Sequence, residues 1–535
     1  MKLLTAAPFS AAGIALHPAS ELHPRLSLDS YRPYIGLVGV LLGAVMATLA
    51  SRVTSFGLAD LRGALGAGYD EGAWITTSFG VGQMLVGVAS PYLGAVFGVR
   101  RVLLLGIVLF FVASLLGPFS PNLAAFLTMQ FLAGIGSGTF IPLTISFIVR
   151  SLPVTLVIYG IAVYAMNIEL SLNVAASLEG WYSDNWSWAW IAWQYCLMLP
   201  VMAICVWYGV PRENVKTDLL RQFDWPGVAY AALGFSLLYA GLDQGNRLDW
   251  INNGTISALL ASGSLLTIAF IVRELITDHP FMNIRLIFRE NLVLLLLLLA
   301  GFRFIILSTA YIIPTYLQTV QNFRELQVGS VLLWIALPQL LIVLPLGALL
   351  KRVDGRWVLA IGAALVGIAC LMAANLTSQW ATTDFLPSQI LQALGQSFAL
   401  TALVVLIVRS INPAEALTIG ALIQVSRLFG GEIGTAFMQT YVRVREQLHS
   451  NLIGLHIDGI AGLTHDRIAA FRNALSVHTG DPAVATAQAT TQLATAVARQ
   501  AAVLSFIDGF AVAALGALAC IFLVAMMRKA KPAPF

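Results

Sequence analysis

Charged side chains are scarce in this sequence, and their scarcity decides the class of protein. Asp, Glu, Lys and Arg make up 10% of the 535 residues, against roughly 25% in soluble domains. Hydrophobic residues make up 58%, and the mean hydropathy is +0.83. This composition excludes a water-soluble fold. We expect the lipid bilayer to be the main partner and expect no binding of nucleic acid.

Lysine, cysteine and catalytic motifs are also rare or missing. None of the five lysines follows a glycine, so a G-x-x-x-x-G-K-[ST] phosphate loop and ATP hydrolysis are excluded. The four cysteines lie in apolar runs without metal-ligand spacing, which indicates small buried side chains. Neither G-x-S-x-G nor H-E-x-x-H occurs. We therefore expect no enzyme activity, no catalytic residues, no cofactor and no metal site.

Apolar residues gather in runs of about twenty, enough for a helix to cross a hydrocarbon core of about 30 Å. We predict fourteen membrane-spanning helices, at 35–57, 73–96, 102–120, 123–148, 154–178, 188–209, 226–243, 254–273, 291–313, 328–350, 357–375, 385–408, 416–440 and 503–527. With a cytoplasmic N-terminus, the inner segments hold nineteen Lys and Arg, whereas the six short outer loops hold only Arg62, Arg247 and Arg324. This asymmetry predicts that both termini are cytoplasmic.

The outer segment 441–502 is the only long extramembrane part of the predicted topology. Asp481-Pro482 is typical of a helix start, with an N-cap followed by proline at the first helical position. The Ala-rich stretch after it predicts a helix that continues into the last span. We expect a helical hairpin on the outer side of the membrane.

An internal repeat divides the chain into two halves. Residues 100–106 and 356–362 share the pattern R-x-V-L-x-x-G, and each follows a Leu-Gly-Ala stretch. Both lie at the inner start of a span, at equivalent places in two sets of six helices, and paired repeats are typical of secondary transporters. The predicted segments are a cytoplasmic tail at 1–34, a six-helix bundle at 35–209, an inserted helix pair at 210–290, a second six-helix bundle at 291–527 and a cytoplasmic tail at 528–535.

Several motifs resemble those of the fourteen-helix drug:proton antiporters of EmrB/QacA type. They are Phe223-Asp224-Trp225-Pro226-Gly227, Leu242-Asp243-Gln244-Gly245, His279-Pro280 and the span from Gln424 to Ala436, which is similar to N-x-x-R-x-x-G-G-x-x-G. The resemblance covers nearly the whole chain and implies the major facilitator fold in an inner membrane. It further implies multidrug-type efflux driven by protons. For exporters of the EmrB kind it implies a periplasmic membrane-fusion adaptor and an outer-membrane channel as partners.

The first half departs from the family pattern. The L-D-x-T of helix one reads Leu49-Ala50-Ser51-Arg52, so the acid is missing and a cation stands nearby. Gln130 stands where helix four usually carries an arginine, and the antiporter motif G-P-x-x-G-G of helix five is absent. These departures leave the expected fold and topology intact. They concern the substrate and the direction of transport.

Five charged residues are predicted at membrane depth: Arg52, Glu169, Arg303, Arg427 and Glu432. Each costs at least about 2.5 to 3.5 kcal/mol on insertion scales, so each needs a partner, a wet cavity or a function. Glu169 is our first candidate for the proton carrier, since Asn173 lies one helical turn away and burial favours the neutral form of a carboxyl. Glu432 is the second candidate.

The predicted substrate-binding residues are Arg52, Arg303, Arg427, Gln424 and Asn173. Three arginines against two glutamates leave an excess of positive charge, which favours organic or aromatic acids as substrates. The alternative for each charged residue is a structural ion pair between helices. We predict a proton-driven exporter of small amphipathic compounds. Two alternatives are an organic-anion importer on the same fold and a non-transporting membrane sensor or scaffold.

Overall fold

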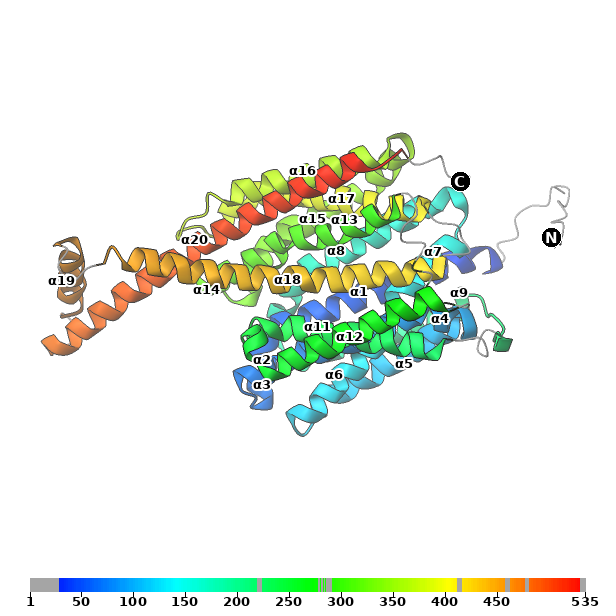
Figure 1. Ribbon diagram of the computed structural model, residues 1–535, viewed down its shortest axis with the longest axis horizontal. Helices are drawn as coiled ribbons and strands as arrows, with labels where there is room; N and C mark the ends of the chain where they lie inside the picture. The colour runs from blue at the N-terminus through cyan, green and yellow to red at the C-terminus, as the bar shows by residue number, and fades with distance from the viewer. Residues whose placement is uncertain are drawn as a thin grey trace, which may run out of the picture.

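The computed structural model describes residues 28–529 except 219–223, 278–279, 281, 283, 285–290, 411–415, 458–461 and 477–480. Within these residues every regular element is a helix, as predicted (Figure 1). Most of the predicted tails at 1–34 and 528–535 lies outside the described residues.

The first half begins with a long helix and continues through eight further helices. They are α1 (Leu28–Phe56), α2 (Leu58–Leu65), α3 (Tyr69–Gly72), α4 (Trp74–Phe97), α5 (Val99–Leu116), α6 (Leu123–Gly138), α7 (Phe140–Ser151), α8 (Val154–Asn185) and α9 (Trp190–Gly209). The inserted pair is α11 (Trp225–Gly245) and α12 (Gly254–Ile276). Asp224 caps α11 by accepting a hydrogen bond from the Gly227 amide at 3.1 Å. The aspartate of the 223–227 motif is therefore the N-cap residue of a helix.

The second half contains two long helices that exceed a membrane span. Its elements are α13 (Leu292–Ile305), the π-helical turn η4 (Ser308–Ile312), α14 (Ile313–Thr319), α15 (Glu325–Arg352), α16 (Gly355–Ala373), α17 (Leu386–Arg409), α18 (Ala416–Gly454), α19 (Gly462–Ser476) and α20 (Pro482–Met526). Thirteen helices in the described part of the chain are long and apolar enough to cross a membrane. The remaining predicted span, 416–440, lies in α18, whose charged residues lower its hydropathy.

The two halves form two helical bundles that meet along two seams (Figure 1). At one seam α8 packs along α15, and at the other α4 packs against α18. The inserted helix α11 lies on this second seam and contacts both α4 and α18, whereas α12 packs mainly on α11. The inserted pair therefore covers one junction between the halves.

The repeated motif has the same structural role in both halves. Gly106 on α5 faces α6, where an added Cβ would lie 2.8 Å from the Gly136 carbonyl oxygen. Gly362 on α16 faces α17 in the same way, 2.9 Å from the Gly395 carbonyl oxygen. The final glycine of each repeat thus allows two helix backbones to touch. This equivalence supports the predicted duplication.

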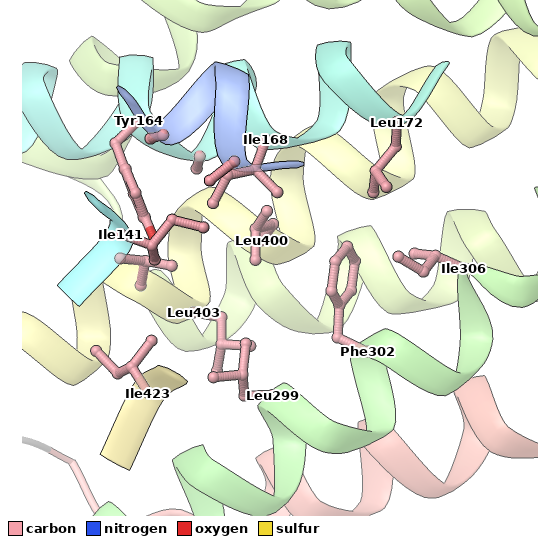
Figure 2. Close-up of a cluster of buried hydrophobic side chains, with 14 of the residues drawn as sticks. Ile141, Tyr164, Ile168, Leu172, Leu299, Phe302, Ile306, Leu400, Leu403 and Ile423 are labelled. Carbon is pink, nitrogen blue, oxygen red and sulfur yellow. The ribbon is translucent and has the colours of Figure 1, made fainter. Parts of the chain in front are cut away.

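A cluster of buried apolar side chains joins the halves at mid-molecule (Figure 2). Tyr164, Ile168 and Leu172 project from one face of α8, at spacings of four residues. They meet Leu299, Phe302 and Ile306 of α13, Leu400 and Leu403 of α17, Ile423 of α18 and Ile141 of α7. Side chains from both bundles therefore fill the space between them on one side of the membrane-depth charges.

The predicted helical hairpin is present, and it projects from the end of the molecule opposite to the start of α1 (Figure 1). Asp481 caps α20 through the Ala483 amide at 2.8 Å, and Pro482 is the first helical residue, as predicted. The helix has 45 residues and continues into the last span. At the base of the hairpin, Asp508 of α20 pairs with Arg445 at 2.6 Å and His449 at 2.7 Å on α18.

Replacing Gly362 with alanine should loosen the α16–α17 contact. The new Cβ would lie 2.5 Å from the Ala399 amide nitrogen, and such overpacking costs about 1 to 3 kcal/mol. We expect a lower melting temperature in detergent, measured by the fluorescence of the purified protein. Gly254→Ala is the control, because nothing lies within 4 Å of its added Cβ. Equal melting temperatures for the two variants would contradict this account of the repeat.

Candidate functional site

A cavity of about 660 Å³ lies between the bundles. Its walls come mainly from α1, α4, α11, α13, η4 and α18, with single residues from α2, α3 and α8, so both halves and the inserted pair contribute. Arg303 and Arg427 mark its deep end, and Tyr69, Arg247 and Arg443 lie toward the hairpin end. The apolar cluster of Figure 2 surrounds the deep end from the other side. The cavity therefore extends toward the hairpin and is filled by side chains in the opposite direction.

Four of the five predicted membrane-depth charges line this cavity: Arg52, Arg303, Arg427 and Glu432. Glu169 does not line it. Glu169 lies with Arg303 and Arg427 around a small void of about 10 Å³ on the far side of these arginines. Arg303 is near enough to both Glu169 and Glu432 for its charge to attract theirs. Arg303 therefore stands between the two proton-carrier candidates.

The five charges do not form direct ion pairs with one another in the described part of the chain. The structural alternative, in which arginines and glutamates lock helices together by contact, is therefore not what the structure contains. One carboxylate oxygen of Glu169 and one of Glu432 are buried without a hydrogen-bond partner. The Nε atoms of Arg52 and Arg303 are also buried without a hydrogen-bond partner.

Arg52 connects the two halves across the cavity. Its Nη2 donates to the backbone oxygen of Ala310 at 2.7 Å. Ala310 lies in η4, where the widened helical turn alters the usual backbone pairing, a feature often found at functional sites. The Arg52 guanidinium also lies 5.2 Å above the Phe56 ring. The cation of helix one is thus held by a carbonyl group and an aromatic face and by no carboxylate.

The two predicted amide residues, Gln424 and Asn173, are hydrogen-bonded to other groups of the protein. Gln424 accepts from Arg427 Nε at 3.3 Å and Nη2 at 3.2 Å, so it positions that arginine. Asn173 donates to the backbone oxygen of Glu169 at 3.0 Å and to Gln339 Oε1 at 3.4 Å. Neither amide lines the large cavity. Asn173 thus belongs to the contact between α8 and α15.

Sequence reasoning did not identify the contribution of α11. Its Tyr239 and Asp243 line the cavity beside Glu432, and the Tyr239 hydroxyl is within hydrogen-bonding reach of that carboxyl. Asp243 accepts a hydrogen bond from Thr77 of α4. The available signal was the Leu242-Asp243-Gln244 motif. In the sequence this motif contributes only to the family resemblance, which does not assign its aspartate to the site.

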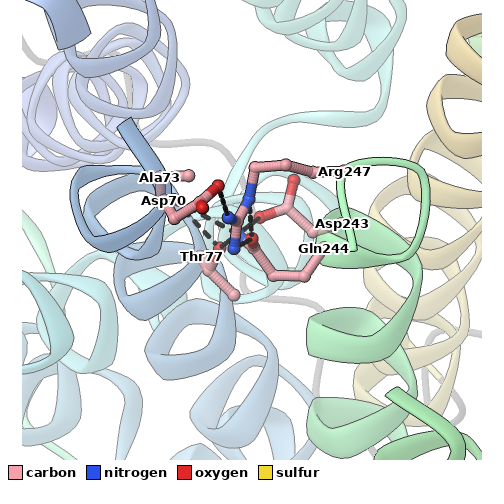
Figure 3. A network of polar contacts seen from close by, with 6 residues as sticks. All are labelled: Asp70, Ala73, Thr77, Asp243, Gln244 and Arg247. Carbon is pink, nitrogen blue, oxygen red and sulfur yellow. Dashed lines mark hydrogen bonds and ion pairs between the residues drawn. The ribbon is translucent and has the colours of Figure 1, made fainter. Parts of the chain in front are cut away.

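A polar network fixes α11 to α4 at the hairpin end (Figure 3). Arg247 donates to Asp70 and, at 2.8 Å and 2.6 Å, to Gln244 Oε1. Gln244 Nε2 donates to Thr77 Oγ1 and to the Ala73 carbonyl oxygen, the latter at 3.3 Å. The network holds Asp243 in place at the wall of the cavity.

These features define a class: a multi-pass membrane protein of two duplicated helical bundles with a polar, positively charged cavity between them. Residues 40–435 match the family description Major Facilitator Superfamily. The chain belongs to the Major Facilitator Superfamily, which confirms the predicted family and fold. The matched region ends before the hairpin.

Three curated relatives are similar over most of the chain. The probable multidrug resistance protein EmrY of Escherichia coli is 25% identical over 434 residues, which cover 79% of this chain and 82% of EmrY. The multidrug export protein EmrB of Haemophilus influenzae is 25% identical, with coverages of 78% and 82%. The fatty acid resistance protein FarB of Neisseria gonorrhoeae is 24% identical, with coverages of 80% and 84%.

Solved structures agree on the fold. An auto-inhibited peptide transporter of the POT family has a TM-score of 0.57 at 16% identity, covering 94% of this chain and 98% of its own. The proton:xylose symporter XylE has a TM-score of 0.53 at 12% identity, with coverages of 91% and 95%. At these identities the likeness shows the arrangement of helices alone.

Proposed function

We propose that this protein is a proton-driven secondary exporter of small amphipathic organic compounds in an inner membrane. The observation that carries the proposal is the cavity between two duplicated bundles, with buried charges at its deep end. The names of the relatives EmrY, EmrB and FarB support export. The bias of nineteen inner against three outer Lys and Arg supports cytoplasmic termini. With that orientation the cavity extends toward the outer side.

Proton coupling in this proposal uses two carboxyl groups on either side of Arg303. Glu432 lines the cavity and can exchange protons with water that enters it, whereas Glu169 lies beyond the arginines. Each has an oxygen without a partner, so a proton can be added without breaking a hydrogen bond. Protonation of Glu432 removes one of the two attractions on Arg303 and leaves that of Glu169. The guanidinium then favours the deeper position.

Glu169→Gln and Glu432→Gln should each abolish proton-coupled transport, because the amide keeps the size of the side chain but cannot titrate. The measurement is substrate-induced proton movement in vesicles reconstituted with the full-length protein. Glu71→Gln is the control, since that carboxyl is exposed at the outer end. Unchanged proton movement in both buried variants would remove these carboxyls from the mechanism.

We further propose that the preferred substrates are amphipathic or aromatic carboxylates. Arg52, Arg303 and Arg427 line the cavity, and a guanidinium stays charged in protein interiors and suits carboxylate geometry. Two carboxylates, those of Glu432 and Asp243, line the same cavity. Asp243 accepts a hydrogen bond from Thr77. The acid that the resembled family carries in helix one is replaced here by Ala50.

Arg52→Gln and Arg303→Gln should each weaken transport of an aromatic carboxylate. Loss of a hydrogen bond to a charged group costs about 1.5 to 3 kcal/mol, which is roughly a 10- to 150-fold loss of apparent affinity. This loss is measured as reduced uptake of the aromatic carboxylate into inverted vesicles. Arg324→Gln is the control, because that side chain is 82% exposed. A contrary result would be that cells expressing the protein resist quaternary ammonium dyes but not aromatic acids, and that both cavity variants behave as the wild type. The arginines would then be structural.

The hairpin of segment 441–502 is proposed to contact a periplasmic membrane-fusion adaptor that leads to an outer-membrane channel. Its apolar side chains Leu452, Leu455 and Val484 are 46%, 77% and 43% exposed. Unlike the lipid-facing residues of the spans, they lie on the part that projects beyond the bundles (Figure 1). An exposed apolar surface there is typical of a protein interface.

Photo-crosslinking residues at positions 452, 455 and 484 should capture the adaptor in the native host. The same residue at position 255, exposed at the outer start of α12, is the control and should capture nothing. Capture is read by immunoblot for a membrane-fusion protein. Absence of that product at all three hairpin positions would show that the hairpin is not the contact surface.

A further inference from the structure

A second cavity, of about 560 Å³, lies at the end of the N-terminal bundle opposite to the hairpin. It is formed where α1, α5, α7 and α9 end or begin. Its polar lining consists mainly of guanidinium groups and aromatic rings, namely Arg32, Arg100, Arg150, Arg212, Trp207 and Tyr208. The function proposed above does not use any of these residues.

The lining of the second cavity carries four arginines from separate parts of the sequence. Among the residues that the structure describes, no acidic side chain lines it. Within the described residues, Arg100, Arg150 and Arg212 have no ion pair. The Arg100 guanidinium lies over the Trp207 ring, 4.4 Å from its centroid, which fixes its position. Glu213, the next residue after Arg212, packs its Cβ against Gly98 and is not part of the lining.

Close packing of two helices shapes this cavity. At the crossing of α1 and α9, a Cβ added to Gly36 would lie 2.8 Å from the Gly209 carbonyl oxygen. The helix backbones therefore touch at this point. Arg32 lies one helical turn before Gly36, and Arg212 lies three residues after Gly209. The contact brings two arginines from distant parts of the sequence to the same hollow.

The cavity is continuous with a lipid-facing surface. On α9, Leu197, Val201, Ile204 and Tyr208 are 63%, 48%, 59% and 65% exposed, at spacings of four, three and four residues. These spacings place them on one face of the helix. The face runs from mid-membrane to the cavity, where Trp207 and Tyr208 stand at the depth typical of interfacial aromatic residues. Acyl chains can therefore lie along α9 while a headgroup occupies the cavity.

We propose that this cavity binds the headgroup of an anionic phospholipid with two phosphates, such as cardiolipin. The unpaired guanidinium groups of Arg100, Arg150 and Arg212 suit a headgroup with more than one phosphate, and arginine binds phosphate oxygens in a bidentate manner. Basic pockets between membrane helices at the inner side are known to suit such lipids. The adjoining apolar face of α9 favours a lipid over a soluble phosphate compound, because the soluble compound would contact the arginines but not that face.

The test is ligand binding to the purified full-length protein, by native mass spectrometry and by the shift in melting temperature. The probes are tetraoleoyl cardiolipin, dioleoyl phosphatidylethanolamine and sodium pyrophosphate. The variant is Arg100→Gln with Arg150→Gln. The control is Arg101→Gln with Arg352→Gln, which removes the same charge from the same end of the molecule but from outside the cavity.

We expect one cardiolipin to stay bound to the wild type, about a tenfold or greater loss of affinity in the cavity variant and less than a twofold loss in the control. Equal losses in both would show that diffuse positive charge, and no built site, attracts the lipid. Equal binding of pyrophosphate, or of phosphatidylethanolamine, would also overturn the proposal. If the double variant does not fold, Arg212→Gln serves instead, since Arg212 is exposed and has no bonded partner in the described structure.

Discussion

The charge of Arg303 between the two bundles is the constraint on which the centre of this protein depends. A guanidinium at that depth is costly unless water or opposite charge reaches it, and here Glu169 and Glu432 attract it from opposite sides. Arg52 and Arg427 add further positive charge nearby. Gly431 keeps the space open, since an added Cβ would lie 3.3 Å from Arg303 Nε. The cavity is therefore a condition for placing these charges between the bundles, as well as the proposed site for substrate.

The fold was predictable because its signals are local. Runs of apolar residues set the spans, the Asp481-Pro482 pair set the start of α20, and the repeated R-x-V-L-x-x-G marked equivalent helices. Hydropathy also identified Arg427 and Glu432 as buried, because each charge stands inside an apolar run of the sequence. In each case the sequence around the residue contains the physical reason for its position.

Partners across helices were not predictable in the same way. Helical spacing placed Asn173 on the face of Glu169, but spacing fixes the face and not the bond, and the amide reaches the Glu169 backbone and Gln339 of α15. Tyr239 and Asp243 were missed as site residues because nothing near them in the chain says that α11 packs on α4 and α18. Such contacts depend on segments far apart in the sequence.

The two seams between the halves differ in what holds them. Along α8 and α15 the backbones touch: an added Cβ at Gly329 would lie 2.6 Å from the Ser177 amide, and one at Gly180 would lie 2.7 Å from Leu326 Cα. At the other seam α4 packs directly against α18, and the hydrogen bonds of Figure 3 join α11 to the α4 side of that seam. Water can replace hydrogen bonds, whereas it cannot enter a backbone contact without separating the helices. The α8–α15 seam is therefore the closer backbone contact, and the polar network that positions Asp243 beside Glu432 belongs to the other seam.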